Sequence, residues 1–396
     1  MILGGIPREL VADEKLWKLI CRANELTDET VSSWDSNAPA LIPLLKRILA
    51  ILKEEQEWKF YFFVMNQLFY VSKRNPEAWT QTAFWVANLF HQDMAGHLSA
   101  FEGEGSYWKF VLASNILLFY LRYPQIDDKN MERMLLLFQE QEHRCGYDRR
   151  KNNNYHAVMD LALFNRDVPM AETARRKLEH GDYEYCCYAC FYGRPMIGYY
   201  VLHEDFEGVE EIIRLLCEKS IPINYRKYFD RCVVSEEKDL VGAALLRCLK
   251  LGRSRLFERI FRRWGQIFGE PGEETEKDVW LMLFHGLAGD WSWDKEGLQQ
   301  AALDDRNRRE QKVPPLNSLY QMLCWYCCFR MLDARGSGKV RLESDDIPGE
   351  GRERTFPEAA EYFEQQADLL GGQMDRARKR FGYQTIKTTF ETCFWG

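Results

Sequence analysis

The fold class is decided by the stretch Glu204-Asp205-Phe206-Glu207-Gly208-Val209-Glu210-Glu211-Ile212-Ile213-Arg214-Leu215-Leu216, a polar turn followed by an amphipathic segment. Its large apolar residues recur three or four positions apart, at Val209, Ile212, Ile213 and Leu216. This spacing places them on one side of an α-helix. Similar stripes fill nearly the whole chain, and alternating β-type segments are scarce. The sequence therefore predicts an all-α fold.

The polar turn recurs along the chain, each time before an amphipathic segment. The turns lie at Asn75-Pro76, Asp127-Asp128, Arg166-Asp167, Glu204-Asp205, Gly252-Arg253 and Gly289-Asp290. Their first residues are 38 to 52 positions apart, with a mean of 43, which suits two helices and two turns. The spacing predicts an α-solenoid of antiparallel helix pairs. An irregular all-α domain with chance spacing is the alternative.

Aromatic content and charge narrow the class of protein. The 396 residues include 24 Phe, 19 Tyr and 12 Trp but only 13 Pro, which excludes a disordered chain. We expect most of these rings to lie between stacked helices. The net charge of −7 argues against a free-standing nucleic-acid binder, because phosphate affinity depends on clustered cations.

Two polar interruptions suggest the domain organisation. An acidic loop follows Phe268, and a glycine-rich stretch with alternating charges covers 333–354, with a short hairpin expected around Lys339-Val340-Arg341-Leu342. We predict an N-terminal helical region, central repeats, and C-terminal repeats that carry the polar insertion and a closing helix. These three parts are assigned to 1–157, 158–270 and 271–396.

The closing helix is expected to begin at a capping box. Thr355 and Glu358 have the required spacing, and Pro357 lies in the first turn. Apolar residues then follow at spacings of three and four as far as Phe381, and Gly382 can end the helix.

The sequence also predicts the compartment. The N-terminus shows no secretory signal, and the most apolar stretch, Phe110 to Leu121, is 12 residues long, shorter than a membrane span. The 12 cysteines are irregularly placed in a chain that does not need disulfides, so we expect reduced thiols. A cytoplasmic protein without a membrane partner follows from these expectations.

Several segments together resemble bacterial tetratricopeptide-like (TPR-like) proteins, common in actinobacteria. The similar segments are 130–147, Cys187-Tyr188-Ala189-Cys190, Glu204-Asp205-Phe206-Glu207-Gly208-Val209, 245–253 and Arg378-Lys379-Arg380-Phe381-Gly382-Tyr383. The resemblance covers about 100–385 and depends on the order of these landmarks more than on any single motif. It implies an α-solenoid that binds other proteins, with no catalytic residues to transfer.

The cysteines suggest one candidate metal site. Cys187 and Cys190 have the spacing of half a zinc site. The other half could be Cys324 with Cys327, or His203 with Cys217. We prefer thiols on a helical face of the core, and we predict no metal and no cofactor.

The strongest charge feature runs from Arg247 to Arg263, with seven cations and one acidic residue, Glu258. On a helix Arg255, Arg259 and Arg262 would share one face, and the opposite face would carry an apolar stripe of Leu256, Ile260 and Trp264. The predicted partner-binding residues are Arg253, Arg255, Arg259, Arg262 and Arg263. The alternative is a solvated face balanced by the acidic loop at Glu270 to Glu276.

These observations favour a non-catalytic protein-binding module, either a regulatory adaptor or a component of a bacterial conflict or immunity system. Its partner would be a protein with an acidic surface. Two alternatives remain open: a Cys-dependent hydrolase using a thiol near Cys187 with His203, and an RNA-binding helical-repeat protein that uses the basic segment.

Overall fold

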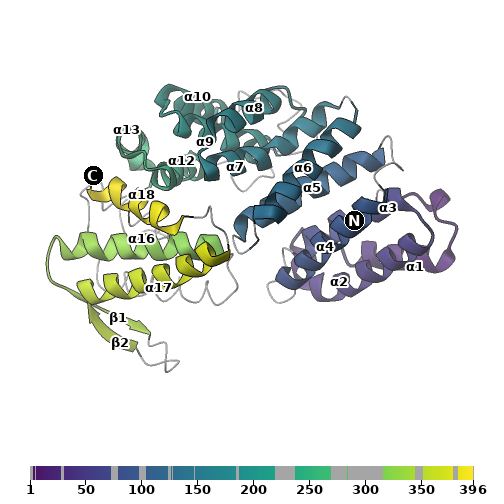
Figure 1. The fold of residues 1–396 in the computed structure, drawn as a ribbon, viewed down its shortest axis with the longest axis horizontal. Helices are drawn as coiled ribbons and strands as arrows, with labels where there is room; N and C mark the ends of the chain where they lie inside the picture. The colour runs from purple at the N-terminus through teal and green to yellow at the C-terminus, as the bar shows by residue number, and fades with distance from the viewer. Residues whose placement is uncertain are drawn as a thin grey trace. The chain divides into compact units, whose positions relative to one another are not determined.

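The computed structural model describes most of the chain, and it is predominantly helical (Figure 1). The described residues are 3–4, 6–27, 31–72, 79–97, 104–123, 126, 128–146, 148–183, 187–218, 237–268, 283, 315–343, 351–377 and 382–395. Strands occur there only as one two-stranded sheet. The predicted all-α class is confirmed with this small exception. Among these residues, none of the helices has both the length and the apolar character that crossing a lipid bilayer requires.

The chain divides into two compact units. Unit 1 contains Met1–Leu117 and Glu132–Lys151, and unit 2 contains Leu118–Met131 and Asn152–Gly396. The borders expected near 157 and 270 remain predictions, and residue 270 lies outside the described part of the chain.

Unit 1 is built from antiparallel helices around an aromatic core. Its elements are η1 (Arg8–Leu10), α1 (Glu14–Glu25), α2 (Val31–Glu54), α3 (Trp58–Ser72) and α4 (Trp79–His97), and it shares α5 (Glu104–Arg122) and α6 (Asp128–Arg144) with unit 2. α2 packs on α3, and α3 on α4. Fully buried Phe62 and Phe90 meet edge to face between α3 and α4, with ring centroids 6.1 Å apart.

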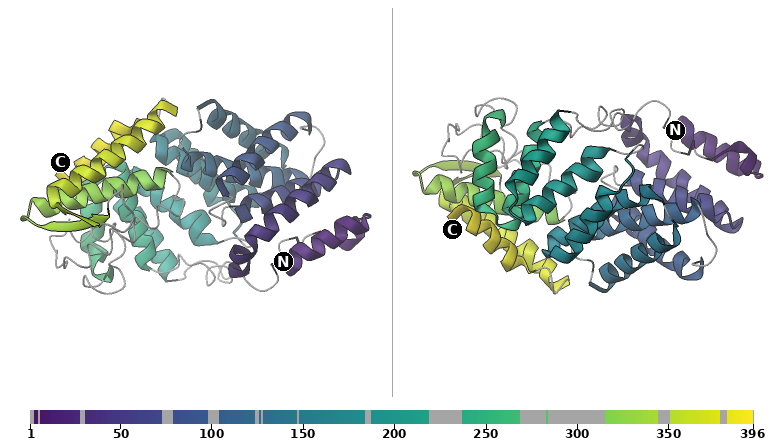
Figure 2. Two further views of the ribbon diagram at one scale, coloured as in Figure 1. Left: turned by 90° about the horizontal axis from the view of Figure 1, so that it is seen from below. Right: turned by 90° about the horizontal axis from the view of Figure 1, so that it is seen from above.

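Unit 2 begins with three helical hairpins. They are formed by α7 (His156–Asn165) with α8 (Val168–Glu179), α9 (Arg194–Leu202) with α10 (Phe206–Cys217), and α12 (Glu237–Leu251) with α13 (Ser254–Trp264). A π-helical turn, η3 (Ala189–Gly193), leads into α9, while η2 (Arg149–Tyr155) precedes α7 and η4 (Gly265–Phe268) follows α13. The first helices of the hairpins stack, because α7 packs on α9 and α9 on α12. The three hairpins follow one another, coloured from teal to green, in the right-hand view of Figure 2.

The same turn closes all three hairpins. Its first residue has a left-handed backbone, with φ of 54° at Arg166, 57° at Glu204 and 69° at Gly252. The next residue donates its N–H to the carbonyl five positions earlier. These N···O distances are 2.8 Å from Asp167 to Ala162, 2.9 Å from Asp205 to Tyr200 and 2.8 Å from Arg253 to Cys248. The turns predicted at these three positions are confirmed.

Side-chain caps start two of the second helices. The Asp167 carboxylate accepts a hydrogen bond from the N–H of Met170, and the Asp205 carboxylate accepts one from Gly208. Of the other predicted turns, Asp128 begins α6, whereas Asn75-Pro76 and Gly289-Asp290 lie outside the described residues.

The C-terminal part of unit 2 contains the predicted hairpin. Its elements are α16 (Pro315–Asp333), β1 (Lys339–Glu343), β2 (Gly351–Thr355), α17 (Phe356–Ala377) and α18 (Tyr383–Trp395). The strands pair antiparallel, with Val340 opposite Arg354. Between α16 and α17, Phe329 and Phe363 stack with an interplanar angle of 8° and centroids 5.7 Å apart. These rings lie between helices, as the aromatic content predicts.

The capping box before α17 is also confirmed. The N–H of Thr355 donates to the Glu358 carboxylate over 2.7 Å, and the N–H of Glu358 donates back to the Thr355 hydroxyl over 3.4 Å. The predicted end of this helix at Phe381 lies outside the described residues, which follow α17 as far as Ala377. A further helix, α18, was not predicted from the sequence.

Candidate functional site

The arginines predicted to bind a partner lie on or next to α13, the second helix of the third hairpin. The buried residues Leu256, Ile260 and Trp264 form its inward side, as the spacing predicts. Arg255, Arg259, Arg262 and Arg263 are exposed on the other sides, and Arg253 precedes the helix in the turn. Helical periodicity therefore separates the packed side of α13 from its charged side.

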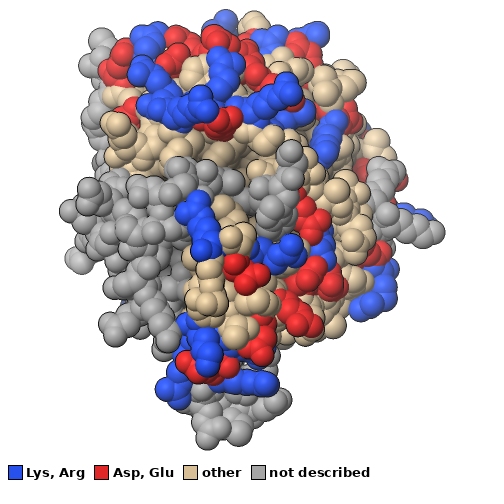
Figure 3. All heavy atoms as spheres, turned by 90° about the vertical axis from the view of Figure 1, so that its left-hand side faces the viewer, with Lys and Arg blue, Asp and Glu red and all other residues tan. Residues whose placement is uncertain are grey.

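Three of these arginines pair with glutamates of the preceding hairpin. We call these pairs the Arg–Glu ladder, and their N···O distances are 2.7 Å for Arg253 and Glu204, 3.0 Å for Arg259 and Glu207, and 3.1 Å for Arg263 and Glu210. In Figure 3 the Lys and Arg side chains over this part of unit 2 lie among Asp and Glu side chains. The negative charges that balance these three arginines thus come from α10 and from the turn before it. The acidic loop at 270–276 lies outside the described residues.

Two arginines form what we call the outer arginine edge, Arg255 and Arg262. They are seven positions apart and so lie on one side of α13. The Arg262 side chain is 77% exposed and pairs with Glu258 of its own helix. Arg255 is exposed, and no described carboxylate forms an ion pair with it. Within the described part of the chain, neither arginine of this edge pairs with a glutamate of the preceding hairpin.

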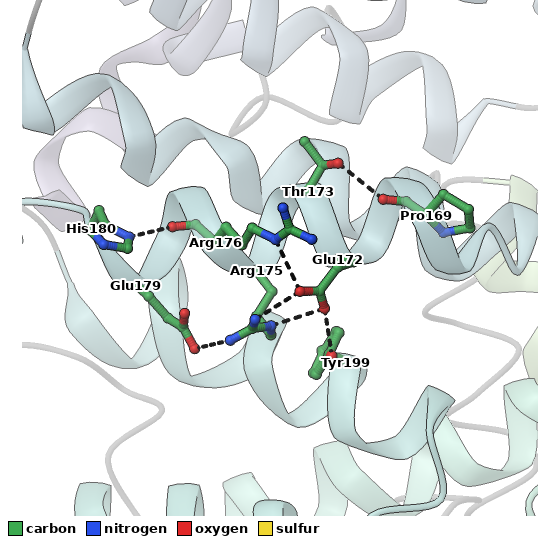
Figure 4. A network of polar contacts seen from close by, with 8 residues as sticks. All are labelled: Pro169, Glu172, Thr173, Arg175, Arg176, Glu179, His180 and Tyr199. Carbon is green, nitrogen blue, oxygen red and sulfur yellow. Dashed lines mark hydrogen bonds and ion pairs between the residues drawn. The ribbon is translucent and has the colours of Figure 1, made fainter.

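A second charged network joins α8 to α9 (Figure 4). Arg175 donates to Glu172 over 2.8 Å and to Glu179 over 2.5 Å, and the Tyr199 hydroxyl donates to Glu172 over 2.7 Å. The hydrogen bond from Arg175, followed by that from Tyr199, holds the pKa of Glu172 well below its usual range. Burial and then Glu172 raise the pKa of Tyr199 to about 12. Both groups stay in the charge states that hold the two helices together.

The Cys-x-x-Cys segment lies beside a cluster of tyrosines. The N–H of Cys190 donates to the Cys187 sulfur over 3.3 Å, and Tyr188 stacks on Tyr192 with centroids 4.7 Å apart. Among the described residues, no three His, Cys, Asp or Glu side chains gather as metal ligands would. Cys324 and Cys327 are buried in α16.

Several thiols are held in the neutral form. Burial raises the pKa of Cys217 to about 11 and that of Cys393 to about 11, and it raises the pKa of Cys327 well above the usual value. A nucleophilic cysteine needs the opposite shift, because the thiolate is the reactive form. The ring of His203 packs on Tyr199, with centroids 4.5 Å apart.

The turn at Gly252-Arg253 divides the basic run, residues 247–263, between α12 and α13. Arg247 and Lys250 precede Gly252 and lie on α12, not on the ladder. Arg247 lies 3.8 Å from Asp160 of α7, and Lys250 lies over the ring of Tyr320 of α16, 4.3 Å from its centroid. With Arg194 of α9, whose positive charge acts on Arg247, they form a group that we call the inner cation cluster, and no sequence pattern pointed to it.

Comparison with known proteins adds no assignment to this geometry. No protein-family model, no curated protein and no solved structure matches the chain.

Proposed function

We propose that this chain is a non-catalytic, cytoplasmic protein-binding protein of the TPR-like α-solenoid type. The observation that carries the proposal is the stacking of α7 on α9 and of α9 on α12, in three hairpins closed by the same turn. Stacked hairpins of this kind present an extended surface made from successive repeats, which repeat proteins use to bind partners. The resemblance of the sequence to TPR-like proteins points the same way.

The proposed partner presents an acidic surface to the outer arginine edge. Arginine forms bidentate hydrogen bonds with carboxylates and is common among the residues that dominate interface energetics. The pair between Arg262 and Glu258 is exposed, and such surface pairs contribute at most about 1 kcal/mol. Partner carboxylates can therefore replace Glu258 with little loss of stability.

The biological role follows only by analogy. A regulatory adaptor and a component of a bacterial conflict system both use a binding surface of this type, and fold alone does not separate them.

The two alternatives have less support. RNA binding requires cations that act together, whereas the ladder places a glutamate beside Arg253, Arg259 and Arg263. A Cys-dependent hydrolase requires an activated thiol, and the raised pKa values of Cys217 and Cys393 argue against those two thiols as the nucleophile, though not against one near Cys187.

Affinity capture from the native cell with the full chain tests the proposal. The variant Arg255→Glu/Arg262→Glu reverses the outer arginine edge. Lys18→Glu/Arg22→Glu is the matched control, because both residues are exposed on α1 and the change in charge is the same. We expect a specific partner to be lost with the first variant and kept with the control.

A set of captured proteins that is identical for both variants would contradict the role of the edge. RNA in the captured material, bound with a steep dependence on salt concentration, would favour the nucleic-acid alternative instead.

A further inference from the structure

The inner cation cluster and its contacts involve four helices of unit 2, namely α7, α9, α12 and α16. Arg247 and Lys250 are three positions apart on α12, so they lie on neighbouring parts of one face. Lys250 projects over the ring of Tyr320 on α16, and Arg247 points toward Asp160 on α7, as their distances of 4.3 and 3.8 Å show.

Arg194 joins this group from α9. A Cβ atom placed on Gly198 would lie 2.8 Å from Nε of Arg247, so the Arg247 guanidinium packs against the backbone of α9 at that glycine. Arg194 is one helical turn before Gly198, on the same side of α9. Its Nε atom is buried and has no hydrogen-bond partner among the described residues. A buried N–H donor without a partner is unfavourable, and a bound hydrogen-bond acceptor would remove that penalty.

The cations of this group outnumber its described carboxylates. Desolvation, followed by the positive charge of Arg247, lowers the pKa of Lys250 to about 8. Desolvation also lowers the pKa of Arg247, and Asp160 is the only described carboxylate that opposes these effects. Buried like charges are unfavourable unless a negative charge compensates them.

The cluster is partly exposed to solvent. The Arg247 side chain keeps 20% of its surface exposed, and the Asp160 side chain keeps 37%. The cluster therefore combines partial desolvation, which strengthens electrostatic attraction, with access from solvent.

We propose that Arg194, Arg247 and Lys250 form a binding site for a small phosphate-type oxyanion, such as a phosphate or diphosphate group. The two guanidinium groups supply planar forks of N–H donors that match phosphate oxygens, and the ammonium group supplies a compact positive charge. This site is independent of the outer arginine edge, and its ligand would be a small molecule instead of a protein.

Isothermal titration calorimetry on the full chain, with pyrophosphate and inorganic phosphate as probes, tests the proposal. We expect one molecule of pyrophosphate to bind per chain and to raise the melting temperature. Lys250→Met and Arg247→Met should each weaken binding at least about tenfold, which corresponds to about 1.4 kcal/mol. Arg262→Met is the control, because Arg262 is exposed on α13, and this variant should bind pyrophosphate as the wild type does.

Folding of the variants is checked separately. Lys250→Met removes a partly desolvated charge above an aromatic ring, so its melting temperature without phosphate should not fall below that of the wild type. This variant keeps the test valid if Arg247→Met fails to fold.

Three outcomes would overturn the proposal. In the first, pyrophosphate does not bind. In the second, it binds the Lys250→Met variant as well as the wild type, which would place its site elsewhere. In the third, citrate at equal ionic strength binds more tightly than pyrophosphate, which would indicate a carboxylate site.

Discussion

The Nη2 atom of Arg259 on α13 lies 3.0 Å from Oε1 of Glu207 on α10, and it joins two helices of neighbouring hairpins. The same guanidinium lies over the ring of Phe206, 4.3 Å from its centroid. Such a cation–π contact contributes about 0.5–1 kcal/mol at an exposed site. Arg259 therefore stabilises the contact between the hairpins by both charge and packing.

Exchanging the charges of this pair tests the ladder. Arg259→Glu places two carboxylates together, so we expect a lower melting temperature. Adding Glu207→Arg should restore part of the loss, though not the part due to Phe206. Thermal denaturation at low and high salt measures both effects, which salt should weaken. The control Arg255→Glu should change stability less. If the double variant is no more stable than Arg259→Glu, the pair of Arg259 and Glu207 contributes nothing to stability.

The sequence could predict the helix that carries this pair but not the partner. Spacings of four between Leu256, Ile260 and Trp264 were enough to predict the buried side of α13. The partner of Arg259 lies 52 positions earlier, and stacking of hairpins brings it into place. For the same reason, the sequence did not show that Arg247 lies in the inner cation cluster and not in the Arg–Glu ladder.

The caps at Asp167 and Asp205 should each stabilise the helix that they begin. Asp167→Ala and Asp205→Ala remove the acceptor for a backbone N–H, at a cost of about 1 kcal/mol of unfolding free energy. Urea denaturation measures the change. Thr173→Ala, in the exposed part of α8, should have little effect or slightly stabilise the protein. Equal losses for Asp167→Ala and Thr173→Ala would argue against a capping role.

Local signals also explain which helices the sequence revealed. The capping box at Thr355 and the turns at 166–167, 204–205 and 252–253 place polar groups where helix ends need them. α18 lacks such a signal, and its threonines have low helix propensity. Contacts with α17 compensate, since the Tyr383 hydroxyl donates to Asp368 over 2.9 Å and Lys387 donates to Glu364 over 2.5 Å.

Lys250 should make stability depend on pH in the alkaline range. Its pKa is about 8 in the folded chain and 10.5 ordinarily. Between these values the unfolded chain holds a proton that the folded chain has released, so stability should rise with pH from about 8 to about 10.5. The measurement is urea denaturation across this range for the wild type and Lys250→Met. Parallel curves for the two proteins would contradict the lowered pKa.

A buried carboxylate in unit 1 should make Tyr61 important for stability. Asp93 is 7% exposed and accepts hydrogen bonds from the Tyr61 hydroxyl over 2.5 Å and from Lys53 over 2.7 Å. Tyr61→Phe leaves one carboxylate oxygen without its donor, and we expect a loss of about 1.5–3 kcal/mol in the free energy of unfolding. Tyr70→Phe is the control on the same helix, because Tyr70 is 41% exposed. Chemical denaturation that gave equal losses for both variants would contradict this role.

Two glycines of one hairpin should respond in opposite directions to the same substitution. Gly252 has a φ of 69°, and an added Cβ would lie 3.0 Å from Cγ2 of Thr389, so Gly252→Ala should lower the free energy of unfolding by about 1–2 kcal/mol. Gly242 lies within α12, where an added Cβ meets no atom within 4 Å, so Gly242→Ala should raise it by about 0.5–1 kcal/mol. Urea denaturation of both variants checks the pair. Stabilisation by Gly252→Ala would mean that the third hairpin does not close with the left-handed turn it shares with the other two.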